Sequence, residues 1–144
     1  MQGYVEITGS GIRLAGSVVF GDPTRSLYAS ALPLVSAIAA DMVFGEVASD
    51  GAYFTGIALL NPGNTDATAT VEVLDRNGAQ VAAKQERIDA KRRRSRLLTE
   101  MFPALSGQQR RSGQIRVRGS GGLIGFALLG TNDALSAVPA QSVP

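Results

Sequence analysis

The end of this chain repeats its beginning, and this internal repeat is the strongest constraint on the fold. Residues 3–11 (GYVEITGSG) align without a gap with residues 113–121 (GQIRVRGSG). Both copies then run through an apolar stretch that stops at glycine, at residues 16–21 and 125–130. Because the apolar residues recur at matching positions, we expect the two copies to form equivalent strands.

The length of the repeat indicates the kind of domain. Both copies finish with Ser-Ala-x-Pro, at residues 30–33 and 136–139, and the offset between matching residues falls from 110 to 106. A period of about a hundred residues is the size of a β-sandwich domain and too long for a solenoid unit. We therefore predict one complete repeat at residues 41–144, packed as one unit with the closing part of a preceding repeat at residues 1–40.

Alternation of apolar and polar residues predicts strands at residues 4–8, 69–75, 80–82 and 114–118. A more buried strand is expected at 51–61, where the chain reaches an Asn-Pro-Gly-Asn turn. The fold should be all-β: an antiparallel two-sheet, Ig-like β-sandwich of about eight to ten short strands. Segments 3–33 and 113–139 should contribute three strands each.

Glycine and proline positions predict the turns. Asn77-Gly78 lies between two strand patterns and predicts a hairpin, because both residues tolerate positive φ. The glycine-rich sequences at 9–11 and 119–122 are also interpreted as hairpin turns. The alanine-rich segment 34–41 is expected to be a short helix or a linker.

One segment is predicted to be helical, near residues 96–102. Its apolar residues have the spacing of one helical face: Leu97, Leu98, Met101 and Phe102. Ser95 is the expected N-cap, and Pro103 is expected to end the helix. This short helix should cover one end of the sandwich.

The residue types exclude several kinds of chemistry. The chain has no Cys and no His, which removes disulfides, thiol nucleophiles, imidazole bases and Cys/His metal sites. No apolar run approaches the roughly 18 residues that span a bilayer. We therefore expect no enzymatic activity, no cofactor, no metal site and no membrane span.

Charge is unevenly distributed along the chain. In segment 87–118, ten basic residues against two acids give +8, while four against ten give −6 elsewhere. Such a segment suits a polyanion, and acidic polysaccharide more than nucleic acid, because nucleic-acid sites add exposed aromatic residues. Charge runs are more often solvated, or dock on an acidic neighbour. The candidate contact residues are Arg87, Lys91, Arg92, Arg93, Arg94, Arg96, Arg110, Arg111, Arg116 and Arg118.

Three smaller groups of residues are also weighed as sites. Asp-Arg-Asn-Gly at 75–78 begins like a calcium loop but lacks the later oxygen ligands, so a hairpin turn is favoured. Of the adjacent Tyr53 and Phe54, one is expected in the core and the other on the surface, where it can contact sugar. Turn aspartates usually bind their own backbone, but carboxylates for a cation at one end of the sandwich are offered by Asp22, Asp50 and Asp133.

Residues 44–78 and 93–130 together carry a longer pattern. Its elements are VASDG at 47–51, TGIAL at 55–59, NPG at 61–63, DRNG at 75–78, RRSRLLTEMFP at 93–103, GQIRV at 113–117 and GFALLG at 125–130. The pattern resembles a tandem β-sandwich repeat module of large secreted proteins of Acidobacteria and similar soil bacteria, of the Ig-like, cell-adhesion-related type. The resemblance implies an extracellular or cell-surface location, and no catalytic residue is carried over from it.

From the repeat, the charge and the resemblance, we expect a non-catalytic structural or adhesive module of a secreted or cell-surface bacterial protein. It would act by module–module or protein–protein contact, with neighbouring modules or identical chains as partners. The +8 and −6 regions favour head-to-tail self-assembly into a homo-oligomer, and unpaired strands within 3–33 offer an edge to a neighbour. The alternative is a carbohydrate- or polyanion-binding module that uses segment 87–118.

Overall fold

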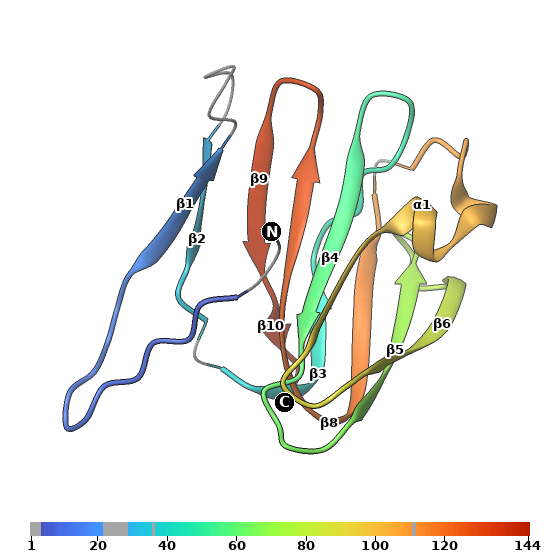
Figure 1. Ribbon diagram of the computed structural model, residues 1–144. Coiled ribbons are helices and arrows are strands. Elements are labelled where there is room, and N and C mark those ends of the chain that lie inside the picture. Colours follow the sequence, from blue (N-terminus) through green and yellow to red (C-terminus); the bar gives the residue numbers. More distant parts are fainter. Residues whose placement is uncertain (1–3, 22–28, 36, 111) are drawn as a thin grey trace.

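Strands make up most of the regular structure, as the alternating sequence pattern predicts (Figure 1). The computed structural model describes residues 4–21, 29–35, 37–110 and 112–144. Between β7 and β8 lie the α-helix α1 (Leu98–Met101) and the 3-10 helix η1 (Pro103–Leu105). The strands are β1 (Ser17–Gly21), β2 (Ala29–Pro33), β3 (Ala39–Phe44), β4 (Phe54–Leu60), β5 (Ala67–Leu74), β6 (Gln80–Ile88), β7 (Arg93–Leu97), β8 (Gln114–Gly130), β9 (Leu135–Pro139) and β10 (Gln141–Ser142).

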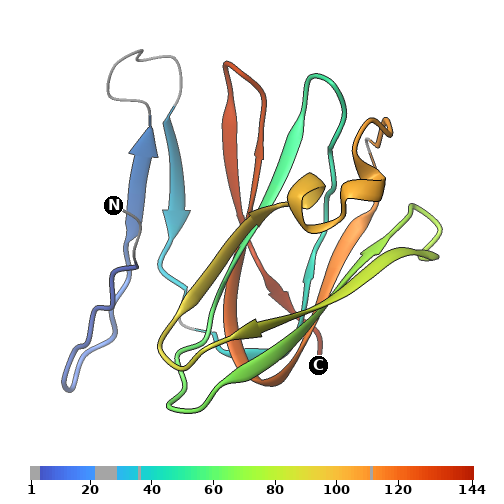
Figure 2. The ribbon, with the colours of Figure 1, turned by 45° about the vertical axis from the view of Figure 1, so that its right-hand side comes forward.

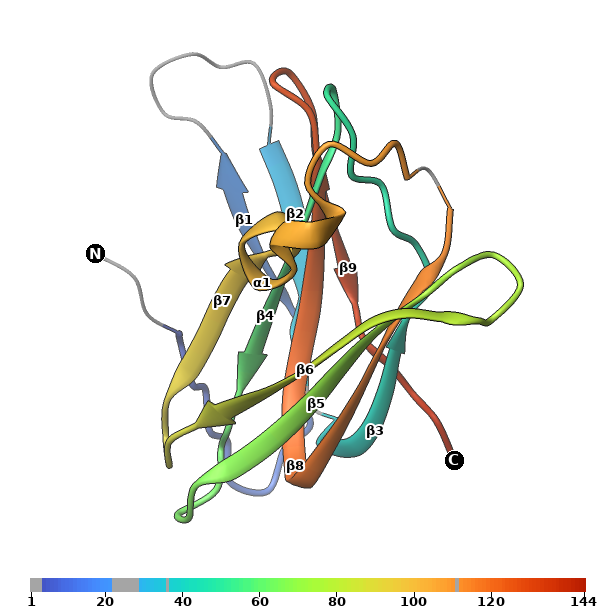
Figure 3. The ribbon, with the colours of Figure 1, turned by 90° about the vertical axis from the view of Figure 1, so that its right-hand side faces the viewer.

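The long strand β8 belongs to both layers of a β-sandwich. Its first half lies between β3 and β5, in a sheet of order β10–β3–β8–β5–β6. Its second half lies between β4 and β9, in a sheet of order β9–β8–β4–β7. All these pairs are antiparallel, and Figure 3 shows β8 running through the middle of the molecule. The predicted antiparallel two-sheet β-sandwich is therefore confirmed.

The glycine-rich sequence at 119–122 is where β8 passes from one sheet to the other. Gly119 pairs with Ala69 of the first sheet, whereas Ile124 pairs with Leu60 of the second. The predicted hairpin turn is wrong, because residues 119–122 stay within β8 and none of their glycines has a positive φ. Space explains two of these glycines: a Cβ would lie 2.6 Å from Gly121 O at Gly119, and 2.3 Å from the side chain of Ile38 at Gly122.

The core fills the space between the inner faces of the two sheets. In β5, buried residues alternate with more exposed ones over most of the strand, which is the pattern of a half-buried strand. Each fully buried aliphatic side chain contributes about 1.5–3 kcal/mol. The most deeply buried apolar residues are Met42, Phe44, Val47, Leu59, Ala69, Val71, Val73, Ile88, Leu98, Ile115, Val117, Leu123 and Ala127.

The predicted helix near 96–102 is confirmed, but it begins later than expected. Leu97 is the N-cap, and its N–H donates to the Glu100 carboxylate at 3.0 Å. The predicted N-cap Ser95 is wrong, because Ser95 lies in β7 and pairs with Ala58 of β4. The helix ends at Met101, and Pro103 begins η1. Leu98, Met101 and Phe102 pack in the core as predicted, whereas Leu97, expected on the same face, is 37% exposed.

Part of the sequence repeat is also a structural repeat. In β1–β2, Ser17 pairs with Pro33 and Gly21 with Ala29. In β8–β9, Phe126 pairs with Pro139 and Gly130 with Leu135, which are the matching residues of the second copy. Even the hydrogen bond that follows is repeated, from Leu34 N to Gly16 O at 2.9 Å and from Ala140 N to Gly125 O at 3.2 Å. The prediction of equivalent structure is confirmed for this hairpin.

The first part of the repeat has different structures in the two copies. Residues 114–118 lie in β8, whereas residues 4–16 contain no strand. The expectation of three strands in each copy is wrong, because each copy contributes two strands within the described residues. Two flanking strands hold residues 114–118 in place, and 4–8 has no such neighbours. The turn predicted at 9–11 is a bend, with Gly11 at φ +73°, and it joins no two strands.

The β1–β2 hairpin stands beside β9, outside both sheets (Figures 1 and 2). The Ala137 N–H of β9 donates to Ser30 Oγ of β2 at 3.1 Å. The connection from β2 back to the sandwich is irregular up to Ile38 within the described residues, and β3 begins at Ala39. The short helix considered for 34–41 is therefore wrong, and the expected boundary between residues 40 and 41 falls inside β3.

Candidate functional site

The basic residues of segment 87–118 are spread over three parts of the fold. Five of them, from Arg87 to Arg94, lie at the end of β6, in the turn to β7 and at the start of β7, and Arg96 follows in β7. Arg116 and Arg118 lie on the outer face of β8, because Ile115 and Val117 point into the core. Arg110 lies in the loop before β8, and Arg111 lies outside the described residues.

The two arginines of β8 form ion pairs across the first sheet. Arg116 binds Asp41 of β3 through two bonds, Nε–Oδ1 at 3.0 Å and Nη2–Oδ2 at 2.5 Å. Arg118 binds the Glu72 carboxylate of β5, whose side chain is only 10% exposed. The hydrogen bond from Arg116 lowers the pKa of Asp41 below its ordinary value, although partial burial opposes the shift. The same bond raises the pKa of Arg116.

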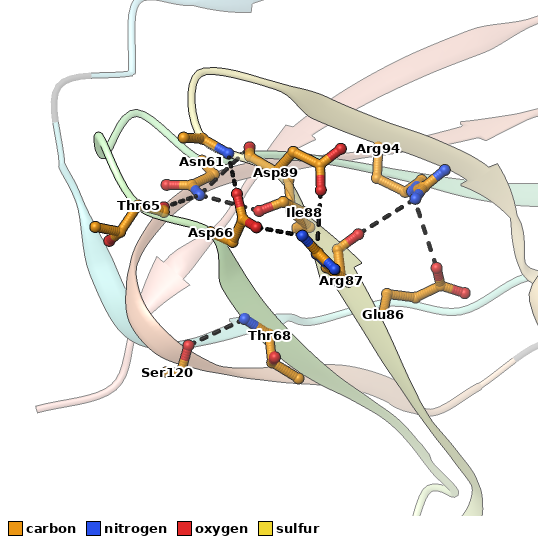
Figure 4. A network of polar contacts seen from close by, with 11 residues as sticks. Asn61, Thr65, Asp66, Thr68, Glu86, Arg87, Ile88, Asp89, Arg94 and Ser120 are labelled. Atoms are coloured by element: carbon orange, nitrogen blue, oxygen red, sulfur yellow. Dashed lines mark hydrogen bonds and ion pairs between the residues drawn. The ribbon is translucent and has the colours of Figure 1, made fainter.

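A second group of ion pairs lies between β5, β6 and β7 (Figure 4). Arg87 binds Asp66 at 2.5 Å and Asp89 at 3.2 Å. Hydrogen bonds from the Ala90 N–H and from Arg87 lower the pKa of Asp66, and Asp66 in turn raises the pKa of Arg87. Arg94 Nε lies 3.9 Å from the Glu86 carboxylate, so charges from two edge strands meet at the open side of the sandwich.

Four basic residues of the segment are thus paired with acids from outside it. The acidic partners are Asp41, Asp66, Glu72 and Glu86. The +8 and −6 regions therefore face each other within one chain, and the charge available to an external partner is smaller than the sequence suggests. Within the described residues, Arg92 and Arg96 are exposed and lack an acidic partner.

A buried asparagine holds the basic turn between β6 and β7. Asn61 is 2% exposed, and its Nδ2 donates to Thr65 O at 2.8 Å and to Ile88 O at 3.0 Å. Its Oδ1 accepts from Gly63 N at 2.9 Å, and its own N–H donates to Arg92 O at 2.9 Å. The turn that begins at Asn61 was predictable from the sequence, but its link to β6 was not, because Ile88 lies 27 residues away.

The hairpin turn at 75–78 is confirmed. Asp75 Oδ1 accepts from Asn77 N at 2.8 Å and from Ala79 N at 2.9 Å, and Gly78 has φ +82°. Asn77 has no positive φ, so the turn needs glycine at one position and not at two. The Asp75 carboxylate is occupied by its own backbone, as in an ordinary turn.

Asp50 and Asp133, two of the three aspartates considered for a cation, lie in loops that their own local hydrogen bonds hold. Asp50 Oδ1 accepts from Ala52 N at 2.7 Å and from Tyr53 N at 2.8 Å. Asp133 lies in the β8–β9 turn, where Thr131 Oγ1 accepts its N–H at 3.2 Å, and Asp22 lies outside the described residues. Among the residues that the structure describes, no group of three or more acidic side chains could hold a metal ion.

Neither aromatic residue at the start of β4 lies in the core. Tyr53 is 41% exposed. Phe54 is half-buried over Gly130, where a Cβ would lie 2.4 Å from its ring. The expectation that one of them is a core residue is wrong, because the inward position belongs to Thr55. Its Oγ1 donates to Ala48 O at 2.6 Å and accepts from Ala48 N at 2.9 Å.

An open hollow lies beside the β5–β6 turn. Its volume is about 340 Å³, and it is lined by Asp75, Arg76, Asn77, Gln109, Arg110 and Ser112. Glycoside hydrolysis usually needs two carboxylates about 5–10 Å apart, and this hollow has one, which is already bound in the turn. The hollow therefore offers no acid–base pair of that kind.

The comparisons with known proteins support the fold alone. The described residues include no helix long and apolar enough to cross a membrane. No family model matches the chain, and no curated protein does. Among solved structures, the crystal structure of Thermotoga maritima 1070 is similar, with a TM-score of 0.61 at 10% sequence identity. The match covers 73% of this chain and 95% of that chain, so the two share a β-sandwich.

Proposed function

We propose that the chain is a non-catalytic structural module of a secreted or cell-surface bacterial protein, and that it acts by contact with other modules of its kind. The observation that carries the proposal is the β1–β2 hairpin. It repeats the pairing of the β8–β9 hairpin, yet it lies outside both sheets of the sandwich. The sandwich already contains its own closing hairpin, so we infer that the additional one serves a neighbouring module.

Exposed apolar side chains around this hairpin support a contact role. The residues before and in β1 include Val5 at 77%, Ile7 at 55%, Ile12 at 68% and Val19 at 69% exposure. Single exposed apolar residues are ordinary, but several of them within residues 5–19 favour a contact role for this segment. Burial of this segment against a partner would be favourable.

The size of the sandwich also supports the proposal that this sandwich is one module among others of the same type. The match to the Thermotoga maritima structure uses nearly all of that chain but leaves more than a quarter of this one outside. Residues 39–144, which begin with β3 and are 106 of the 144 residues, would make a unit of that size. The remaining residues then belong to a second unit of the same type. The secreted or surface setting rests on the resemblance of residues 44–78 and 93–130 to the bacterial repeat module.

Light scattering over a concentration series tests the contact function. We expect reversible association of single chains that persists at high salt, because apolar contacts are not screened as charges are. Val19→Asp should reduce the associated fraction. Asn64→Asp, which adds the same charge in a turn at the end of β4, should leave it unchanged. A strict monomer at high concentration, in both low and high salt, would contradict the proposal.

Polyanion binding remains the second candidate, because Arg92 and Arg96 are exposed and have no acidic partner among the described residues. This function requires an affinity for heparin that falls steeply with salt. The double variant Arg92→Ala/Arg96→Ala should then flatten the dependence, whereas Arg76→Ala, in an exposed turn, should not. Our proposal expects no salt-sensitive binding of heparin in any of the three proteins.

A further inference from the structure

We propose that residues 4–33 are a donor segment, which supplies the β8–β9 unit of another module of this kind. Residues 4–8 would insert between the strands of that module that are equivalent to β3 and β5. β1 would pair with the strand that is equivalent to β4. This inference rests on the proposed module function and names the segment, its register and its acceptor. The acceptor is a module whose own β8–β9 position is open.

The first support is a pair of apolar residues in opposite environments. Val5 and Ile7 match Ile115 and Val117 in the repeat. Ile115 and Val117 are both 0% exposed, in the middle of the core, whereas Val5 and Ile7 are 77% and 55% exposed. The segment thus has the sequence of a central strand but lacks a sandwich around it. An open β8 position would bury both side chains as Ile115 and Val117 are buried.

The second support is the open edge of β1. In an antiparallel pair, hydrogen-bonded and non-bonded residue pairs alternate. Because Leu34 N donates to Gly16 O, the 19–31 pair is a non-bonded one, so the N–H and C=O of Val19 point away from β2. The matching residue of β8 is Leu128, which pairs with Gly56 of β4 on that side. Within the described residues β1 pairs with β2 alone. Its other edge is therefore open to a strand equivalent to β4 from another module.

The third support is a glycine that this chain does not need. A Cβ at Gly125 would lie within about 3 Å of Met42, Phe44 and Leu59, so the core excludes any larger residue there. A Cβ at the matching Gly16 would meet only the side chain of Leu34, at 3.3 Å. Glycine at residue 16 is explained if that residue also faces a core, which the acceptor module would provide.

Charge defines which module can accept the segment. Glu6 matches Arg116, which binds Asp41 and lies opposite Glu72. In a module identical to this one, Glu6 would therefore lie between two carboxylates, and like charges at such positions repel. The acceptor should carry basic or neutral residues at the positions of Asp41 and Glu72. This requirement also keeps identical chains from inserting into one another.

An extended chain tests the inference directly. A second copy of residues 37–112, which includes the whole of β3, is placed ahead of residues 3–144 and recreates an open acceptor next to the donor segment. Glu6→Arg is added to restore the charge of the matching position. We expect the amide protons of Val5, Ile7 and Val19 to exchange at least roughly 100-fold more slowly than in the single chain, because they become part of a closed sheet.

Two variants distinguish insertion from nonspecific collapse. Val5→Asp should abolish the protection in the extended chain and leave the melting of the single chain unchanged. Thr8→Lys adds a charge at an outward position, where the matching residue is Arg118 beside Glu72 and Asp41, and should preserve the protection. If the three amides exchange as fast in the extended chain as in the single chain, the inference is wrong, including the case in which the added residues stay unfolded. Light scattering of single chains tests the contact function separately, so the two failures can be told apart.

Discussion

Replacing Asn61 by alanine should destabilise the sandwich strongly, although Asn61 lies in a turn. Its side chain joins the turn after β4 to the end of β6, through Thr65 O, Ile88 O and Gly63 N. The Ile88 carbonyl is buried, and a buried group left without a partner costs about 1–3 kcal/mol. The other two bonds lie nearer to solvent, where each contributes about 0.5–1.5 kcal/mol.

From these bonds we expect Asn61→Ala to lower the free energy of unfolding by about 2–4 kcal/mol. That is a large part of the 5–15 kcal/mol typical of a domain, estimated to order of magnitude. Urea unfolding followed by circular dichroism measures it, and the midpoint should fall while the slope stays constant. Asn64→Ala, at an exposed position of the same turn, should change stability by less than about 0.5 kcal/mol. Similar midpoints for the two variants would refute the role assigned to Asn61.

Two further predictions concern the first sheet. Because Arg116 lowers the pKa of Asp41, their ion pair should stabilise the fold fully above the ordinary pKa of 3.8, and this stabilisation should be lost as the pH falls through the lower pKa of the folded state. Acid titration of the unfolding midpoint should show a smaller loss of stability in Asp41→Asn than in the unmodified protein. An unchanged acid response in this variant would contradict the assignment. Gly113 has φ +133°, and a Cβ there would lie 2.4 Å from Leu74 O, so Gly113→Ala should cost at least about 2 kcal/mol in thermal unfolding. Gly51→Ala, where no atom lies within 4 Å, is the control and should be nearly neutral.

Features that depend on local sequence were predictable. The alternation of β5, the Asn77-Gly78 hairpin and the helix near 96–102 follow from periodicity and turn chemistry, which act over a few residues. The equivalence of the β1–β2 and β8–β9 hairpins was also visible, because each hairpin makes its own pairing. The hairpins form between neighbouring segments, and β5 pairs with β6 next to it in the sequence, although β5 also pairs with the distant strand β8.

Features that depend on distant partners were not predictable. Residues 119–122 have the composition of a turn, but strands on both sides keep them extended within β8. Residues 4–8 have the alternation of a strand, yet no strand of the described part of the chain pairs with them. The acidic partners of Arg116 and Arg118 lie 75 and 46 residues away, so the basic segment looked more open to external ligands than it is.

The most direct test of the account compares two matching positions by thiol labelling. The chain has no cysteine, so Ile7→Cys and Val117→Cys each introduce a single reactive group. Ile7→Cys should react at the rate of a free thiol in the single chain and become protected in the extended chain with Glu6→Arg. Val117→Cys should react only when the protein unfolds. If Ile7→Cys is already protected in the single chain, or remains fully reactive in the extended one, residues 4–33 are not the unused closing segment of another module.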